Sequence, residues 1–93
     1  MAEEIINKWI PKFSEELYLD KEFENAYKAI LKIDEKNIDT KYSSYAAGVA
    51  YIACLMTEQL GVTQEMLALV ADCSMESLRK RYKAIIRRIE VIL

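Results

Sequence analysis

Six cationic side chains gather near the C-terminal end of the sequence, where residues 74–93 carry only two acidic ones: Arg79, Lys80, Arg81, Lys83, Arg87 and Arg88. Lysine and arginine neutralise phosphates, and arginine also forms paired hydrogen bonds with a guanine edge. Arg79, Lys83 and Arg87 recur every four residues, so on a helix they share one face. The pattern predicts a basic ridge suited to a nucleic-acid groove. The alternative is a solvated helix face whose cations favour the negative end of the helix dipole.

Two predicted helices joined by a short turn carry this ridge. Thr63 is the expected N-cap of a helix over residues 64–71, and Ser74 caps the last helix, which runs to the end of the chain. Small, turn-forming and apolar side chains follow helix-turn-helix spacing: Ala68, Asp72, Cys73 and Leu78. Such a turn needs a left-handed backbone at position 72, which aspartate tolerates. We expect a helix-turn-helix at about residues 63–92, with an ordinary αα-hairpin as the alternative.

If the last helix docks in the major groove, its cations are expected to make different kinds of contact with the DNA. Arg79, Lys80 and Lys83 are expected to contact the groove. Backbone N–H groups near Thr63 and Ser74 are expected to bind phosphates. Further phosphate contacts are expected from those remaining arginines that prove exposed, among Arg81, Arg87 and Arg88.

Composition favours an all-helical domain. The chain has 93 residues, 53% of them hydrophobic, with two Gly and one Pro. This length fits a single domain over residues 1–93, and so few turn-forming residues disfavour an all-β fold. We expect five helices, with the apolar segment 46–56 as the buried central third helix because it has no polar face. Gly48 is expected to let a neighbouring helix approach this segment closely.

The other helices follow from caps and breaks. Residues 1–9 are expected to form a short helix or an arm, because Pro11 cannot sit inside an unbroken helix. The proline instead suits the first turn of a helix that ends near Leu19. Asp20 is the expected N-cap of the second helix. Gly61 is the expected C-cap after the central helix.

The absence of histidine and the presence of only two cysteines exclude several kinds of site. A structural zinc site needs four Cys or His ligands, and nucleophilic catalysis with a His base needs a histidine. Cys54 and Cys73 are expected to be small buried side chains in a protein from a reducing interior. We find no nucleotide-binding loop and no set of catalytic acids and bases, so we expect no enzyme activity, cofactor or metal. No apolar run reaches 18 residues, so we expect a soluble, intracellular protein with no membrane partner.

Three parts of the sequence resemble a known family in their order and spacing. They are the opening WIPKFSEELYL of residues 9–19, the alanine-rich AAGVAYIA of residues 46–53, and the pair VTQEM and SLRKRYK of residues 62–66 and 77–83. They resemble the second cyclin-like repeat of the transcription factor B family, which comprises archaeal transcription factor B and eukaryotic general factor IIB. The resemblance covers about residues 8–90.

The resemblance implies a five-helix cyclin fold whose helix-turn-helix reads promoter DNA next to the TATA box, together with TATA-binding protein. Arg79 matches a base-reading arginine of the family, with Ser77 beside it. Glu76 stands where the family more often has an apolar side chain. It can accept a hydrogen bond from cytosine N4 or favour the positive end of the helix. Tyr42 stands where the family usually has a proline.

Other parts of the family's proteins do not occur in this sequence, namely the zinc ribbon that recruits RNA polymerase, the linker and the first cyclin repeat. We therefore expect either an excised C-terminal repeat or a stand-alone relative with a narrower role, in an archaeal cytoplasm or a eukaryotic nucleus. The alternative function is a protein-interaction module that does not bind DNA. Residues 1–62 favour it, because seven Lys/Arg against eleven Asp/Glu suit a basic partner.

Overall fold

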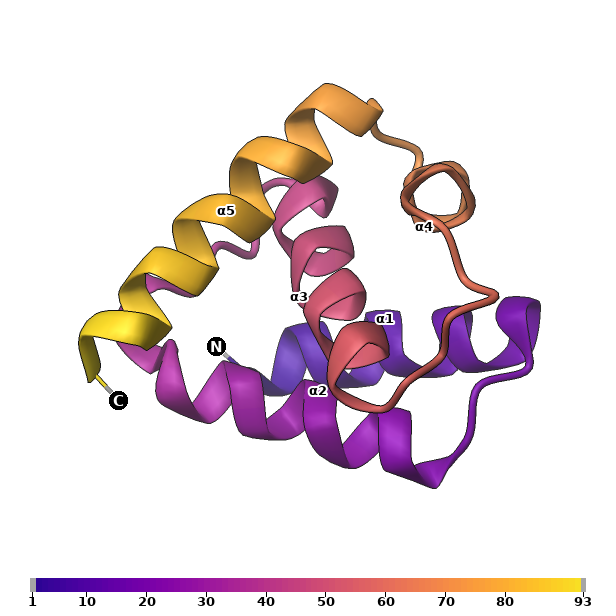
Figure 1. The fold of residues 1–93 in the computed structure, drawn as a ribbon, viewed down its shortest axis with the longest axis horizontal. Helices are drawn as coiled ribbons and strands as arrows, with labels where there is room; N and C mark the ends of the chain where they lie inside the picture. Colours follow the sequence, from indigo (N-terminus) through magenta and orange to yellow (C-terminus); the bar gives the residue numbers. More distant parts are fainter. Residues whose placement is uncertain (1, 93) are drawn as a thin grey trace.

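Five α-helices and one short 3₁₀ helix form the part of the chain that the computed structural model describes, residues 2–92 (Figure 1). Along the chain these are α1 (Ala2–Leu17), α2 (Lys21–Ile33), the 3₁₀ helix η1 (Glu35–Asn37), α3 (Ser43–Met56), α4 (Gln64–Ala71) and α5 (Met75–Ile92). These residues include no β-strand. The predicted all-helical class with five α-helices is therefore confirmed.

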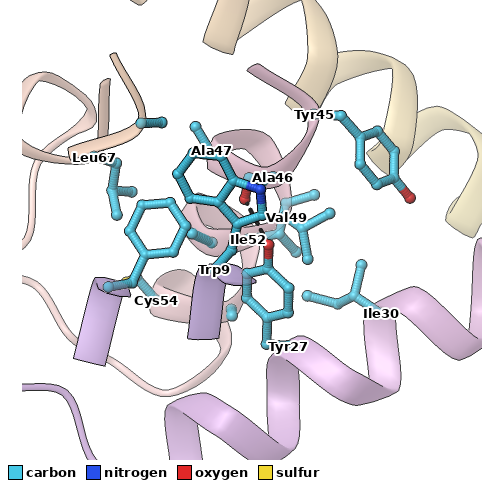
Figure 2. Packing of buried hydrophobic residues seen from close by; sticks show 14 of the residues in the cluster. Trp9, Tyr27, Ile30, Tyr45, Ala46, Ala47, Val49, Ile52, Cys54 and Leu67 are labelled. Carbon is cyan, nitrogen blue, oxygen red and sulfur yellow. Dashed lines mark hydrogen bonds between the residues drawn. The ribbon is translucent and has the colours of Figure 1, made fainter. Parts of the chain in front are cut away.

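Helix α3 is the centre of the fold, as its apolar sequence predicts. Ten of its 14 residues are buried, and it packs against all four of the other α-helices. Figure 2 shows Trp9, Tyr27 and Leu67, which come from three different helices, arranged around its alanine-rich stretch. The Tyr27 hydroxyl donates a hydrogen bond to the carbonyl oxygen of Ala46 at 3.0 Å. The core is thus built around one helix, and the other helices cover it.

Helix α5 approaches α3 closely at Gly48. A Cβ atom placed on this glycine would lie 3.0 Å from the backbone nitrogen of Tyr82 and 3.1 Å from the Cβ of Arg81, both on α5. A side chain here would push the two helices apart, because protein interiors leave little free space. The expectation that Gly48 permits a close approach is confirmed. The contact fixes the middle of α5 against the core.

Helix α1 runs through Pro11 without a break, so the predicted interruption at this residue is wrong. The proline is exposed, whereas Trp9 and Ile10 before it and Phe13 after it are buried. Burying large apolar side chains on both sides of the proline stabilises the continuous helix by more than the roughly 3 kcal/mol that an internal proline costs. The helix also ends earlier than predicted, at Leu17. Here packing overrides the local preference of one residue.

The predicted cap of α2 is confirmed, whereas the predicted cap of α3 is wrong. The Asp20 carboxylate accepts a hydrogen bond at 3.2 Å from a backbone N–H in the first turn of α2. By contrast, α3 stops at Met56, and Gly61 does not have a left-handed backbone. Thr57 instead donates its N–H and its hydroxyl to the carbonyl oxygen of Ala53, at 3.1 and 2.8 Å. The chain leaves the helix at Glu58, which has a left-handed backbone with φ 57°, and the N–H of Gln59 donates to the carbonyl oxygen of Cys54 at 2.9 Å, so the helix ends before the glycine.

Candidate nucleic-acid interface

Helices α4 and α5 are joined by a turn of three residues, 72–74, and they cross each other. Figure 1 shows α4 nearly end-on while α5 lies across the view. Asp72 has the predicted left-handed backbone, with φ 55° and ψ 49°. Its N–H and that of Cys73 donate to the carbonyl oxygens of Leu69 and Ala68, at 3.2 and 3.0 Å. The turn thus satisfies carbonyl groups at the end of α4 and redirects the chain into α5.

Hydroxyl groups cap both helices at the predicted positions. The Thr63 Oγ1 atom accepts a hydrogen bond from the backbone N–H of Met66 at 3.2 Å, at the start of α4. The Ser74 Oγ atom accepts one from the backbone N–H of Ser77 at 3.1 Å, at the start of α5. Ser74 also donates its hydroxyl proton to the Ser77 oxygen at 2.9 Å. Each helix start is therefore fixed by its own sequence.

Helix α5 is held by one side, which leaves the other side to solvent. Leu78 and Ile85 are completely buried against the core. The predicted basic ridge lies on the exposed side of the same helix and consists of Arg79, Lys83 and Arg87, called the α5 ridge below. The structure thus places these three cations together on one face of α5, as their four-residue spacing predicts, and all three are exposed to solvent.

The cations of the α5 ridge differ in their partners. Arg79 donates its Nε–H to the Oε1 atom of Gln64 at 2.9 Å, which ties α5 to the start of α4. The four Nη–H donors of this guanidinium are not used in that bond. Lys83 and Arg87 form no ion pair with any residue in the described range 2–92. Their charges are therefore not neutralised by a direct partner there.

Glu76 places one negative charge at the start of α5. Its carboxylate lies 3.6 Å from the Nζ atom of Lys80, and both side chains are more than three-quarters exposed, at 79% and 77%. A pair so exposed contributes at most about 1 kcal/mol and exchanges readily with solvent. Lys80 is therefore accessible, although part of its charge is balanced.

Two other arginines of α5 bind the segment between α2 and α3. Arg81 Nη2 lies 2.8 Å from Asp39 Oδ2, and Arg88 donates two hydrogen bonds to Asp34 at 2.7 and 2.8 Å. Each arginine side chain is only about one-third exposed, at 34% and 33%. The structure does not bring either of them together with the α5 ridge. Of the six basic side chains of α5, four face solvent and two serve internal ion pairs.

Asp34 is a buried carboxylate that the sequence pattern did not predict. It is 1% exposed, and besides Arg88 it accepts a hydrogen bond from the Tyr45 hydroxyl at 2.7 Å. Burial acts to raise the pKa of Asp34, but hydrogen bonds from Arg88 and Tyr45 outweigh it, so this pKa is lowered. Burial, followed by the neighbouring carboxylate, raises the pKa of Tyr45. A signal did exist, since Tyr27, Ile30 and Asp34 follow helical spacing and extend the buried stripe of α2.

Both cysteines are free thiols, and neither is activated. Cys54 is buried as predicted, and its burial raises the pKa of its thiol to about 12. Cys73 is half-buried and packs against the core. Burial, together with the adjacent Asp72, raises the pKa of Cys73. A raised pKa lowers the fraction of reactive thiolate.

No protein-family model, curated protein or solved structure matches this chain. Among the residues that the structure describes, no three Cys, Asp or Glu side chains gather as a metal site. Within the same part of the chain, no helix is both long and apolar enough to cross a membrane. The function is therefore inferred from the chain's own residues and their geometry.

Proposed function

We propose that this chain is a DNA-binding domain that inserts α5 into the major groove of a duplex. One observation carries the proposal: the α5 ridge is exposed, whereas Leu78 and Ile85 on the opposite side of the same helix are fully buried. An α-helix with its side chains is about 10–12 Å across, which fits the roughly 12 Å width of the major groove. A helix anchored by one side and cationic on the other fits this groove.

Arg79 is the proposed base-reading residue. Gln64 accepts its Nε–H, so the guanidinium plane is held before DNA arrives. The two Nη groups remain for the O6 and N7 acceptors of a guanine. Holding a long side chain in advance lowers the entropy lost on binding. Lys80 and Lys83 follow within the next turn and add contacts in the groove.

Phosphate contacts are proposed on both sides of the reading position. Arg87 lies two turns further along α5 and suits a phosphate. The starts of α4 and α5, capped by Thr63 and Ser74, present backbone N–H groups that favour anions, and Ser77 lies in the first turn of α5. Arg81 contributes less, because an aspartate already balances its charge at 2.8 Å. Fewer than six of the cations of α5 are thus proposed to contact DNA.

The resemblance to the transcription factor B family gives this proposal a setting. Four α-helices around a buried third helix, with a crossed pair at the C-terminal end, agree with the expected cyclin-like repeat and helix-turn-helix and support them. We therefore assign the chain a non-catalytic role at promoters, bound beside the TATA box with TATA-binding protein. Its setting is the archaeal cytoplasm or the eukaryotic nucleus. A zinc ribbon elsewhere would recruit RNA polymerase.

Salt-dependent titrations test this function. Fluorescence anisotropy compares a labelled promoter duplex, containing a TATA box and its upstream flank, with a scrambled duplex of equal length. We expect tighter binding to the promoter, and an affinity that falls with salt by about 0.9 logarithmic units per phosphate contact for each tenfold rise. Adding TATA-binding protein should raise the affinity for the promoter alone. No binding to either duplex at about 50 mM salt rejects the proposal.

A second candidate is a protein-interaction module without DNA binding, and an apolar groove favours it. The groove lies between the end of α3 and the starts of α4 and α5, has a volume of about 490 Å³ and includes Tyr51, Leu55, Leu60 and Val62. Leu55 and Leu60 are 48% and 82% exposed. Exposed apolar side chains that adjoin in a groove are typical of partner-binding surfaces. If the folded chain does not bind DNA at low salt, the protein-interaction module becomes the leading proposal.

A further inference from the structure

Three lysines surround a hollow beside the turn between α4 and α5. The hollow has a volume of about 380 Å³ and is lined by Lys8 and Lys12 of α1 and by Lys41 of the segment before α3. We call these three residues the lysine pocket. All three are exposed, and none forms an ion pair with a residue of the described range. Asp72 is the one acidic residue of the lining, so positive charge prevails.

Aromatic rings hold these ammonium groups in place without neutralising them. Lys8 Nζ and Lys12 Nζ lie 5.1 and 5.3 Å from the centroid of the Trp9 ring. Lys41 Nζ lies 5.3 Å from the centroid of the Tyr42 ring. Cation–π contacts of this kind orient a cation but leave its charge available. Lys8 and Lys12 are like charges four residues apart on one helix, an arrangement that costs stability until an anion binds between them.

The lysine pocket is continuous with α5 through Tyr42. Lys41 lies against this ring, and so does Arg81 of α5, with its Cζ atom 5.6 Å from the centroid. Asp72, which lines the pocket, is the residue that opens the turn into α5. Thr40 and Ser43 line the same hollow, and serine and threonine hydroxyl groups can donate to phosphate oxygens. The Tyr42 ring therefore joins the hollow to Arg81 of α5, although Asp39 balances the charge of that arginine at 2.8 Å.

We propose that the lysine pocket binds backbone phosphates of the duplex that α5 reads, as a second DNA contact outside the crossed helices. This inference rests on the proposed function. A duplex is the occupant that the surroundings favour, because the pocket adjoins the turn that leads into the reading helix. Lysine contacts to phosphates carry no sequence information. The pocket therefore strengthens binding to every sequence equally, and the choice of sequence stays with Arg79.

Salt-dependent titrations of the full chain with duplex DNA test this second DNA contact. The variants are the double substitution K8Q/K12Q and the single substitution K41Q. K32Q is the matched control, because Lys32 is an exposed lysine that lines a different hollow, beside the start of α1. Each lysine removed from the pocket should flatten the dependence of log K on log salt by about 0.9. Affinity for promoter and scrambled duplexes should fall by the same factor, with K32Q unchanged. Thermal unfolding checks that all variants keep the fold.

Including the substitution R79A separates the two proposals. If the pocket variants bind like K32Q while R79A loses promoter preference, the lysine pocket is not a DNA contact and the proposed function stands. If the pocket variants flatten the salt dependence while R79A binds like wild type, the pocket stands and the reading role of α5 fails. If the wild-type chain binds neither duplex at about 50 mM salt, both are overturned.

Discussion

Asp34 and Arg88 lie 54 residues apart in the sequence and are joined by two hydrogen bonds, at 2.7 and 2.8 Å. Asp34 directly follows α2, and Arg88 lies in the C-terminal half of α5. Tyr45 of α3 donates a third hydrogen bond to the same carboxylate at 2.7 Å. One buried carboxylate therefore links three helices. It fixes the direction of the part of α5 that carries Arg87, the last member of the α5 ridge.

Removing the guanidinium should destabilise the fold. R88M leaves the Asp34 carboxylate buried, with its main cationic partner gone. Leaving a buried charge unpaired costs about 3 kcal/mol. Urea unfolding followed by circular dichroism measures the change in the free energy of unfolding. R87M is the matched control, because this neighbouring arginine is exposed, and its effect should stay within about 0.5 kcal/mol. Equal effects of the two substitutions would contradict a structural role for the pair.

The same carboxylate makes stability depend on pH. Although burial raises the pKa of Asp34, hydrogen bonds from Arg88 and Tyr45 lower it overall from the ordinary value of 3.8. A lowered folded-state pKa gives stability that is present above the unfolded value and is lost as the pH falls through the folded value. The variant D34N should therefore be less stable than wild type near neutral pH, with a gap that narrows below pH 3.8.

Urea unfolding of both proteins over a range of pH values checks this expectation. The pKa values of Asp39 and Glu24 are also lowered. For Asp39, hydrogen bonds to its carboxylate outweigh the effect of burial, and for Glu24 the main cause is a hydrogen bond from Lys28. These two groups are present in both proteins, so their contributions cancel in the difference. A gap that stays constant from neutral to strongly acidic pH would rule out the assigned role of Asp34.

The crossing of α3 and α5 should not tolerate a methyl group. In G48A, alanine gains about 1 kcal/mol of helix propensity. Its Cβ, however, would lie 3.0 Å from the backbone nitrogen of Tyr82, which moves only if α5 moves. We expect a net loss of about 1–3 kcal/mol in the free energy of unfolding. G61A is the control, because nothing lies within 4 Å of that Cβ position and the loss should be absent. A stabilised G48A would show that α5 shifts freely.

The left-handed residue of the turn should be replaceable by glycine with a gain in stability. Asp72 has φ 55° and ends α4, where a negative charge opposes the helix dipole. Glycine adopts this backbone freely and removes the charge, so D72G should stabilise the fold by about 0.5–1 kcal/mol. D72A removes the same charge, but alanine in this conformation costs about 1–2 kcal/mol relative to glycine, so D72A should be less stable than D72G by that amount. Thermal unfolding of the two variants measures the difference, and a D72A as stable as D72G contradicts the conformation.

The elements that the sequence predicts well are those specified by neighbouring residues. The cap at Thr63, the bounds of the following helix and the left-handed turn at Asp72 depend on groups within a few positions of one another. The continuity of α1 through Pro11 depends instead on the packing of Trp9 and Phe13 against other helices of the core. The residues next to Pro11 in the sequence give no information about that packing. The α5 ridge could be predicted because all of its residues lie on one helix, where a four-residue repeat is enough to place them on the same face.

The internal use of two arginines could not be predicted in the same way. The partners of Arg81 and Arg88 are Asp39 and Asp34, 42 and 54 residues earlier, and they become neighbours only when α5 packs across α3. A count of charges along the chain treats all six cations of α5 as equivalent. The pairing of distant segments decides which of them remain available to a ligand.

Arg79 carries the sequence preference in the proposed complex. Its removal should therefore weaken binding to the promoter selectively, whereas removal of Arg87 should weaken binding to every duplex. R79A deletes the paired hydrogen bonds to a guanine, which should cost about 1–3 kcal/mol on the promoter duplex and much less on a scrambled one. R79K should weaken promoter binding nearly as much, because a lysine cannot form the paired hydrogen bonds. Q64A frees the Nε–H that Gln64 now accepts at 2.9 Å, so it should weaken promoter binding by a smaller factor.

R87A is the matched comparison for this prediction. It removes an exposed cation from the same helix, and because Arg87 is assigned to a phosphate, R87A should weaken binding to both duplexes equally and flatten the salt dependence by about 0.9. Anisotropy titrations at matched salt give both quantities for each variant. Because the two arginines lie on the same face of α5, a general effect of reduced charge would make R79A and R87A alike. Only a base-reading role lowers the ratio of promoter to scrambled affinity for R79A alone, and an unchanged ratio would remove Arg79 from that role.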